Sequence, residues 1–149
     1  MRLISLIFIL FFSILLSSVI FTYFLNTQKP YVSIKGKSFN VEVAKSNKQK
    51  GLGLSKYKRI AQNFGMLFIF ENKDYYSFWM KGMSFPIDII FIRDNKIATI
   101  FKNVDYPKSE NENLKKYKPD ISSDMVFEIN AGLSEKYNFK KGDIVKINY

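Results

Sequence analysis

The sequence predicts a mainly β fold with an α+β tendency: a single compact sandwich or barrel of about seven short strands and two short helices, preceded by one hydrophobic N-terminal helix. Three observations predict it. Apolar and polar residues alternate with period two in several short runs, which is typical of half-buried strands. Turn-forming residues separate these runs. The first 25 residues are almost entirely apolar, so they stand apart from the rest of the chain.

The apolar N-terminal run extends from Leu3 to Leu25 and is interrupted only by serine and threonine. Its length matches the roughly 20 residues that a helix needs to span a bilayer core. It exceeds the apolar core of about 7–15 residues in a secretory signal, and no Ala-x-Ala site closes it. We therefore predict a transmembrane anchor or signal segment over residues 1–25, and we favour an uncleaved anchor over a cleaved signal.

This segment makes the membrane an expected partner, through residues 3–25. Arg2 is the only charge before the run, whereas Lys29, Lys35 and Lys37 follow it, so the positive-inside rule alone favours a cytoplasmic domain. Long domains translocate largely regardless of such charges. We expect a membrane-anchored protein whose soluble domain is extracytoplasmic, either periplasmic or extracellular.

The chain contains neither cysteine nor histidine. Cysteine-based zinc, iron–sulfur and redox sites are therefore excluded, and so is every mechanism that needs an imidazole base. Thioethers are soft ligands that could hold cuprous copper, although methionine more often fills cores. The methionines that could do so are Met66, Met80, Met83 and Met125. We predict no metal and no cofactor.

The net charge of +10 raises the question of a nucleic-acid or anionic-membrane partner. Only three of the 23 basic residues are arginine, which reads phosphates and base edges better than lysine does. We predict no nucleic-acid partner and attribute the charge to solubility or to a weak preference for membrane surfaces.

Residues 26–37 are polar and carry Pro30, and we expect them to form a linker to one β-rich soluble domain over residues 38–149. Strands are expected over 39–44, 66–70, 77–80, 87–92, 96–102, 125–129 and 144–149. The polar stretch 105–123 is long for a turn, so it is either a solvated loop or the rim of a binding site.

Two short helices complete the predicted domain. Ser46 and Gln49 form a capping box, which predicts a helix that ends near Gly51–Gly53. The second helix is expected over residues 133–137. Turns or close backbone approaches are expected at Gly65, Gly132, Gly142 and Asp143.

Asp88 is the clearest candidate for a site residue, because it is the only charge in the apolar run Phe85–Ile92. A buried carboxylate costs several kcal/mol unless it finds a cation, accepts backbone N–H bonds or opens onto a pocket. Lys50, Lys56, Arg59 and Lys81 are the cations that could pair with it. Asp88 is therefore either a structural carboxylate or an acidic group at the floor of a cleft.

Trp79 is the second candidate, together with its neighbours Met80 and Lys81. Alternation sends Trp79 to one face of an extended segment, and its ring is either part of the core or a stacking platform for a sugar. Glu128 lies in another alternating run. With Asp88 it could form a carboxylate pair of the kind that glycosidases use. Catalytic candidates are thus Asp88 and Glu128, and ligand-binding candidates are Trp79, Met80, Lys81 and Asp88.

Six short motifs, in this order, resemble the family known as domain of unknown function 192. They are Gly51-Leu52, Gly65–Phe70, Ser77–Lys81, Pro86–Phe91, Glu128–Gly132 and Lys141–Asp143. The resemblance covers residues 50–147 and implies a small β-rich fold in bacterial or archaeal proteins. The family commonly has Asn-Thr where this chain has Gly82-Met83, and arginine where it has Lys50.

We expect the chain to be an extracytoplasmic module that binds a ligand or associates with the cell envelope, without catalysis of its own. An envelope carbohydrate or another membrane protein is the expected partner. The first alternative is a hydrolase-like enzyme that acts on an envelope polymer through Asp88 and Glu128. The second is an assembly partner of a membrane protein, which would use the polar stretch 105–123.

Overall fold

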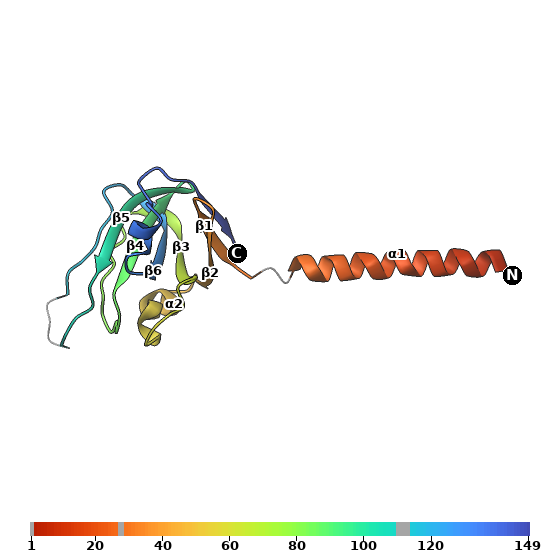
Figure 1. The fold of residues 1–149 in the computed structure, drawn as a ribbon, viewed down its shortest axis with the longest axis horizontal. Coiled ribbons are helices and arrows are strands. Elements are labelled where there is room, and N and C mark those ends of the chain that lie inside the picture. Colours follow the sequence, from red (N-terminus) through yellow and green to blue (C-terminus); the bar gives the residue numbers. More distant parts are fainter. Residues whose placement is uncertain (1, 27–28, 110–113) are drawn as a thin grey trace.

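The structure is a computed structural model that describes residues 2–26, 29–109 and 114–149, and the side chains of the N-terminal helix from residue 7 to residue 22. A curled seven-stranded sheet forms the domain, and the helix α1 (Arg2–Asn26) extends away from it (Figure 1). The predicted mainly β fold with one N-terminal helix is confirmed. Parts of the predicted linker (27–28) and of the polar stretch (110–113) lie outside the described residues.

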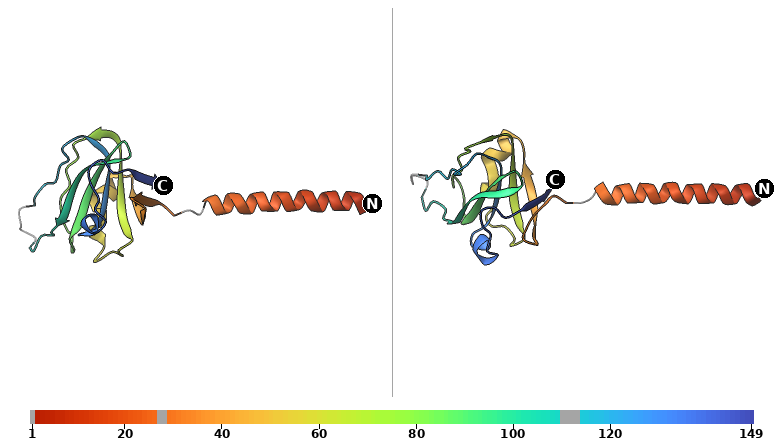
Figure 2. Two further views of the ribbon diagram at one scale, coloured as in Figure 1. Left: turned by 45° about the horizontal axis from the view of Figure 1, so that its top comes forward. Right: turned by 90° about the horizontal axis from the view of Figure 1, so that it is seen from above.

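The sheet has the order β5-β4-β6-β3-β2-β1-β7, and its only parallel pair is β2 with β3. The strands are β1 (Tyr31–Ile34), β2 (Lys37–Ala44), β3 (Phe64–Asp74), β4 (Ile87–Arg93), β5 (Lys96–Val104), β6 (Ser123–Asn130) and β7 (Val145–Asn148). The two edges of the sheet meet at one end, where Lys96 forms an isolated bridge with Ile144. The sheet is therefore a half-barrel, whose curl is visible in Figure 2.

Two predicted segments differ from the structure. Residues 31–34, expected within the linker, form β1, because Val32 and Ile34 are buried while Lys35 and Gly36 make a two-residue turn with positive φ. Residues 77–80, expected as a strand, form none: Phe78 makes one isolated bridge, with Tyr117. The backbone N–H and C=O groups of a short apolar run can also find hydrogen-bond partners in a loop. The alternation of apolar and polar residues alone therefore did not distinguish a strand from a loop here.

The short helices lie near their predicted positions. In α2 (Asn47–Leu52) both halves of the capping box form, since the Gln49 N–H donates to the Ser46 hydroxyl at 3.3 Å and the Ser46 N–H donates to the Gln49 side chain at 2.9 Å. A 3₁₀ turn, η1 (Gly53–Lys56), follows directly, and α3 spans Leu133–Lys136. The segment α2–η1 forms a ledge at one side of the sheet (Figure 1).

The central strands bury both of their faces, which explains their long apolar runs. One face packs inside the curl, because its cluster contains residues from both edge strands, such as Ile97 and Val145. The other face forms a second cluster with Leu54 of η1 and with Met80, Met83 and other residues between β3 and β4. Side chains one position apart on β4 or β6 therefore belong to different clusters.

Helix α1 has exposed apolar side chains over its described part, from Ile7 to Phe21. Within the residues that the structure describes, no helix meets the length and hydropathy needed to cross a membrane.

Gly65 of β3 pairs with Ile129 of β6. A Cβ atom at position 65 would clash with the main-chain oxygen of Glu128 and lie 2.6 Å from the ring of Phe127. Only glycine lets the two strands approach this closely, and the approach fixes β6 where it carries Glu128.

Candidate functional site

Asp88 is fully buried on β4, and backbone donors surround it. Its Oδ1 accepts the N–H groups of Asn103 at 2.8 Å and Gly132 at 3.1 Å, and its Oδ2 accepts the N–H of Ser134 at 2.7 Å. These bonds hold the end of β5 and the start of α3 against β4. Hydrogen bonds to a carboxylate can replace its hydration. Asp88 therefore fits the role of a structural carboxylate better than that of an acidic group at the floor of a cleft.

None of the cations expected beside Asp88 pairs with it in the described structure. Lys56 instead bonds Glu42, whose other oxygen accepts the Tyr57 hydroxyl at 2.6 Å. The hydrogen bond from Lys56 lowers the pKa of Glu42. The backbone N–H groups alone therefore account for the buried charge of Asp88.

Glu128 lies on β6, with an exposed fraction of only 5%. It stands opposite Met66 of β3 and Ile89 of β4, on the sheet face away from the inside of the curl. Asp88 lies two and four positions before Ile90 and Ile92 on the same strand, so its side chain points to the same face as theirs. Ile90 and Ile92 belong to the cluster inside the curl. The two carboxyl groups therefore lie on opposite faces of the sheet, and the structure does not bring the two catalytic candidates together.

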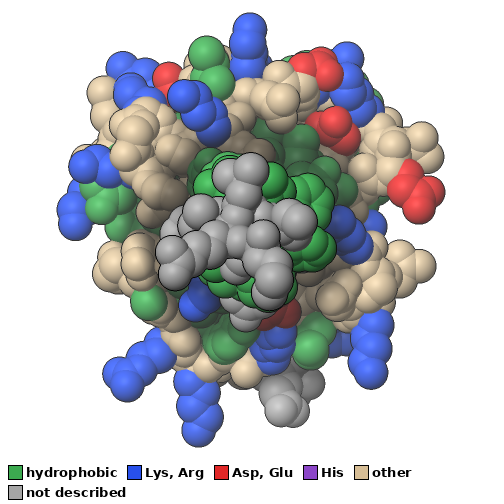
Figure 3. Space-filling view, turned by 90° about the vertical axis from the view of Figure 1, so that its right-hand side faces the viewer, with side chains coloured by type: hydrophobic (Ala, Val, Ile, Leu, Met, Phe, Trp, Pro, Cys, Tyr) green, Lys and Arg blue, Asp and Glu red, His purple; other side chains and the backbone are tan. Residues whose placement is uncertain are grey.

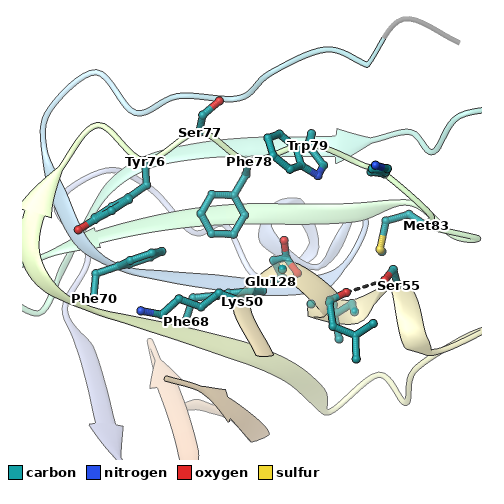
Figure 4. Close-up of a pocket in the computed structure, with 15 residues that line it drawn as sticks. Lys50, Ser55, Phe68, Phe70, Tyr76, Ser77, Phe78, Trp79, Met83 and Glu128 are labelled. Carbon is teal, nitrogen blue, oxygen red and sulfur yellow. Dashed lines mark hydrogen bonds between the residues drawn. The ribbon is translucent and has the colours of Figure 1, made fainter. Parts of the chain in front are cut away.

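A cavity of about 240 Å³ opens above Glu128. The ledge α2–η1 forms one wall, from Lys50 to Ser55, and the returning segment Tyr76–Lys81 forms the other. Phe68 and Phe70 of β3 line it between these walls (Figure 4). Figure 4 shows the Glu128 carboxyl group below Phe78, pointing into this space. No hydrogen bond to the Glu128 side chain forms within the described part of the chain.

Burial alone raises the pKa of Glu128 to about 8, from an ordinary value of 4.5. The physical cause is the cost of taking a carboxylate out of water without a compensating partner. At neutral pH the group is mostly a neutral acid, which can both donate and accept a hydrogen bond. The floor of the cavity is thus polar but uncharged, whereas its walls are largely apolar.

Contacts between aromatic rings fix the position of the segment Tyr76–Lys81, the wall opposite the ledge. Tyr76 stacks on Phe70 with ring centroids 3.6 Å apart, and Phe78 packs edge-on against Phe68 at 5.0 Å. Phe78 is also fixed by backbone hydrogen bonds with Tyr117 in both directions, at 2.9 and 2.8 Å. These contacts hold Trp79 at the edge of the cavity, with 48% of its surface exposed.

The other predicted site residues separate into two groups. Lys81 lines the cavity, whereas Met80 is buried in the adjacent core. Gly132 and Gly142 have φ of 81° and 90°, and Asp143 accepts the Lys140 N–H at 2.8 Å, so these residues shape turns away from the cavity. Met125 packs against the cluster inside the curl and the other three methionines belong to the outer one, so the four do not form a common site.

The prediction missed Lys50, Phe70 and Tyr76 as site residues. The Lys50 ammonium lies 4.4 Å from the centroid of the Phe70 ring. Lys50 was expected only as a possible partner of Asp88, and its neighbours Gly51 and Leu52 only as a family motif and a helix end. A capping box followed by glycines next to a predicted sheet was the available signal that this motif forms a ledge.

The fold and the site define a class: a small, mainly β protein with an aromatic-walled cavity on the outer face of a half-barrel. The DUF192 family model, "Uncharacterized ACR", matches residues 31–147, and the chain belongs to this family. The expected family membership is therefore confirmed.

Two solved structures are similar to the chain. A protein of unknown function from Novosphingobium aromaticivorans has 27% identity and a TM-score of 0.69, and the match covers 78% of this chain and 83% of that one. A candidate transcription regulator from Sinorhizobium meliloti has 27% identity and a TM-score of 0.67, with 79% and 91% covered. No curated protein matches the chain.

Proposed function

We propose that the chain is a ligand-binding module of the cell envelope, anchored in the membrane by its N-terminal segment, with its domain outside the cytoplasm. The cavity above Glu128 carries this proposal. Glu128 is almost buried, no described residue bonds its carboxyl group, and this group opens onto the cavity, where a ligand can supply a hydrogen-bond partner. Asp88, with all its bonds made inside the fold, serves as support for α3 and β5.

A carbohydrate is the ligand class that the cavity fits best. Sugars combine apolar C–H faces, which stack on aromatic rings, with hydroxyl groups that need polar partners. The half-exposed ring of Trp79 supplies the first requirement and the neutral acid of Glu128 the second. Leu52 and Trp79, both exposed large apolar side chains, line the same cavity, which favours a ligand there.

We propose that the cavity binds its ligand and does not hydrolyse it with a pair of acids. Glycoside hydrolysis commonly needs two carboxyl groups that face each other across the scissile bond. Glu128 is the only carboxylic acid among the described residues that line the cavity. A single neutral acid suits hydrogen bonding to a ligand.

Two observations support membrane anchoring. In the sequence, the apolar run Leu3–Leu25 is as long as the roughly 20 residues that a spanning helix needs. The apolar side chains of α1 that the structure describes are exposed, so they need a cover that the domain does not supply. Figure 3 looks along α1 toward the domain, and lysine and arginine side chains are more numerous on that face than the acidic side chains among them. An excess of basic side chains suits an anionic lipid surface.

Peptidoglycan disaccharides are expected to shift the fluorescence of the full-length chain in detergent, because Trp79 is the only tryptophan and lies at the cavity. The shift should saturate at millimolar ligand or below. By calorimetry, Trp79→Ala should weaken binding roughly tenfold through the loss of ring stacking. The matched control is Tyr75→Ala, since Tyr75 is 54% exposed but does not line the cavity. A flat titration up to millimolar ligand argues against the proposal.

The anchor is tested by cell fractionation. The full chain should stay in the membrane pellet after an alkaline wash, and protease added to spheroplasts should digest the domain. Replacing Phe11 and Leu15 by arginine should release the chain, because each charge costs about 3 kcal/mol at the centre of a spanning helix. Full extraction of the unaltered chain, or complete protection from protease, would contradict the anchoring or the orientation respectively.

A further inference from the structure

Lysine side chains without carboxylate partners gather at the cavity above Glu128. Lys50 and Lys81 both line it, and neither forms an ion pair with any described residue. Some other cations of the domain form ion pairs, for example Lys56 with Glu42 and Lys73 with Asp94. The cavity therefore carries two charges that a ligand could neutralise.

Acidic side chains do not balance these charges. Glu128 is the only acid along the described lining, and its burial keeps it mostly protonated at neutral pH. The cavity thus combines a neutral, polar floor with a cationic edge. Such an arrangement disfavours an organic cation and attracts an anion, although aromatic walls alone would suit either.

A second cavity adjoins the first and shares three lining residues with it. The second cavity, of about 550 Å³, is lined by Lys45, Asn72 and Glu71 and shares Lys50, Phe70 and Tyr76 with the first. Lys45 adds a third cation without an ion pair in the described structure and lies 4.6 Å from the centroid of the Tyr149 ring, while Glu71 adds one acid. Space that extends beyond one cavity suits a ligand of more than one unit.

We propose that the ligand is an acidic glycan, with a sugar ring on Trp79, a neutral polar substituent on Glu128 and a carboxylate attracted by the positive charges of Lys50 and Lys81. This inference rests on the proposed carbohydrate-binding function and adds the charge of the ligand to it. The second cavity receives a neighbouring sugar unit. The lysine charges select acidic glycans over neutral glycans of the same size.

Two disaccharides that differ in one acidic substituent test the inference. One contains N-acetylglucosamine and N-acetylmuramic acid, whose lactyl ether carries a carboxylate. The other is chitobiose, which lacks that group. With the full-length chain in non-ionic detergent, Trp79 fluorescence should report at least tenfold tighter binding of the acidic disaccharide, and added salt should reduce this preference.

Lysine variants test which side chains recognise the carboxylate of the ligand. Lys50→Gln and Lys81→Gln should each weaken binding of the acidic disaccharide about fivefold and leave chitobiose binding unchanged, as expected for a partly exposed ion pair. Lys102→Gln is the matched control, because Lys102 is exposed on β5 and lies outside both cavities. It removes the same charge and should change neither affinity.

The outcomes separate the two proposals. Equal affinity for both disaccharides overturns the acidic-glycan inference and supports carbohydrate binding. A preference for the acidic disaccharide that survives both lysine variants overturns the placement of the carboxylate. Binding of neither disaccharide overturns the inference together with the proposed function.

Discussion

Asp88→Asn is expected to lower the free energy of unfolding by about 3 kcal/mol. The carboxylate accepts three backbone N–H groups, from Asn103, Gly132 and Ser134. An asparagine side chain offers one oxygen and turns an NH₂ group toward the remaining donors, which leaves at least one buried N–H without an acceptor. Urea unfolding of the full chain, followed by circular dichroism, measures the loss.

Asp105→Asn is the control for this experiment. Asp105 is exposed, accepts the N–H of Tyr106 at 2.9 Å and forms an exposed ion pair with Lys108 at 3.0 Å, so its replacement should change stability by no more than about 0.5 kcal/mol. An Asp88→Asn protein with unchanged stability but without ligand binding would contradict the structural role of Asp88 and restore its role in the site.

Glu128→Gln is expected to make the protein more stable at alkaline pH. The folded protein holds the Glu128 proton up to a pKa of about 8, whereas the unfolded chain releases it near 4.5. Unfolding therefore releases a proton between these values, and the stability of the unaltered protein falls as the pH rises through this window. The full loss corresponds to at most roughly 5 kcal/mol, reached above pH 8.

The difference in unfolding free energy between Glu128→Gln and the unaltered chain isolates this effect. It should be small near pH 4.5, grow in favour of the variant up to pH 8, and then stay constant. Glu135→Gln, at an exposed position on α3, should show no such growth. A constant difference for Glu128→Gln over the whole range would mean that Glu128 is ionised in the folded protein.

Much of the fold was predictable because local signals agreed with it. The apolar runs of β4 and β6 and the capping box at Ser46 indicated the correct elements, and the lone charge of Asp88 indicated a special environment. The prediction failed where the local pattern was ambiguous. Val32 and Ile34 follow Pro30 in a polar stretch, and their role as β1 depends on pairing with β7, at the other end of the chain.

The candidate site was predictable only in part, because a cavity depends on which faces of distant elements meet. Trp79, Lys81 and Glu128 were identified as candidates, yet no local pattern indicated that Glu128 and Asp88 lie on opposite faces of neighbouring strands. The register of β4 against β6 decides this, since it pairs Asp88 with Ile129 and Ile89 with Glu128. Lys50 lines the cavity because α2–η1 packs on the sheet, and no local sequence pattern specifies this packing.

Methionine methyl NMR tests most directly whether the cavity above Glu128 is the ligand site. Met83 lines that cavity, whereas Met125 packs against the cluster on the other face of the sheet. In the full-length chain with ¹³C-methyl methionine, assigned through Met83→Leu and Met125→Leu, the peptidoglycan disaccharide should shift the Met83 signal in a saturable way and leave Met125 in place. A bound ligand that shifts Met125 and leaves Met83 unchanged would contradict the account.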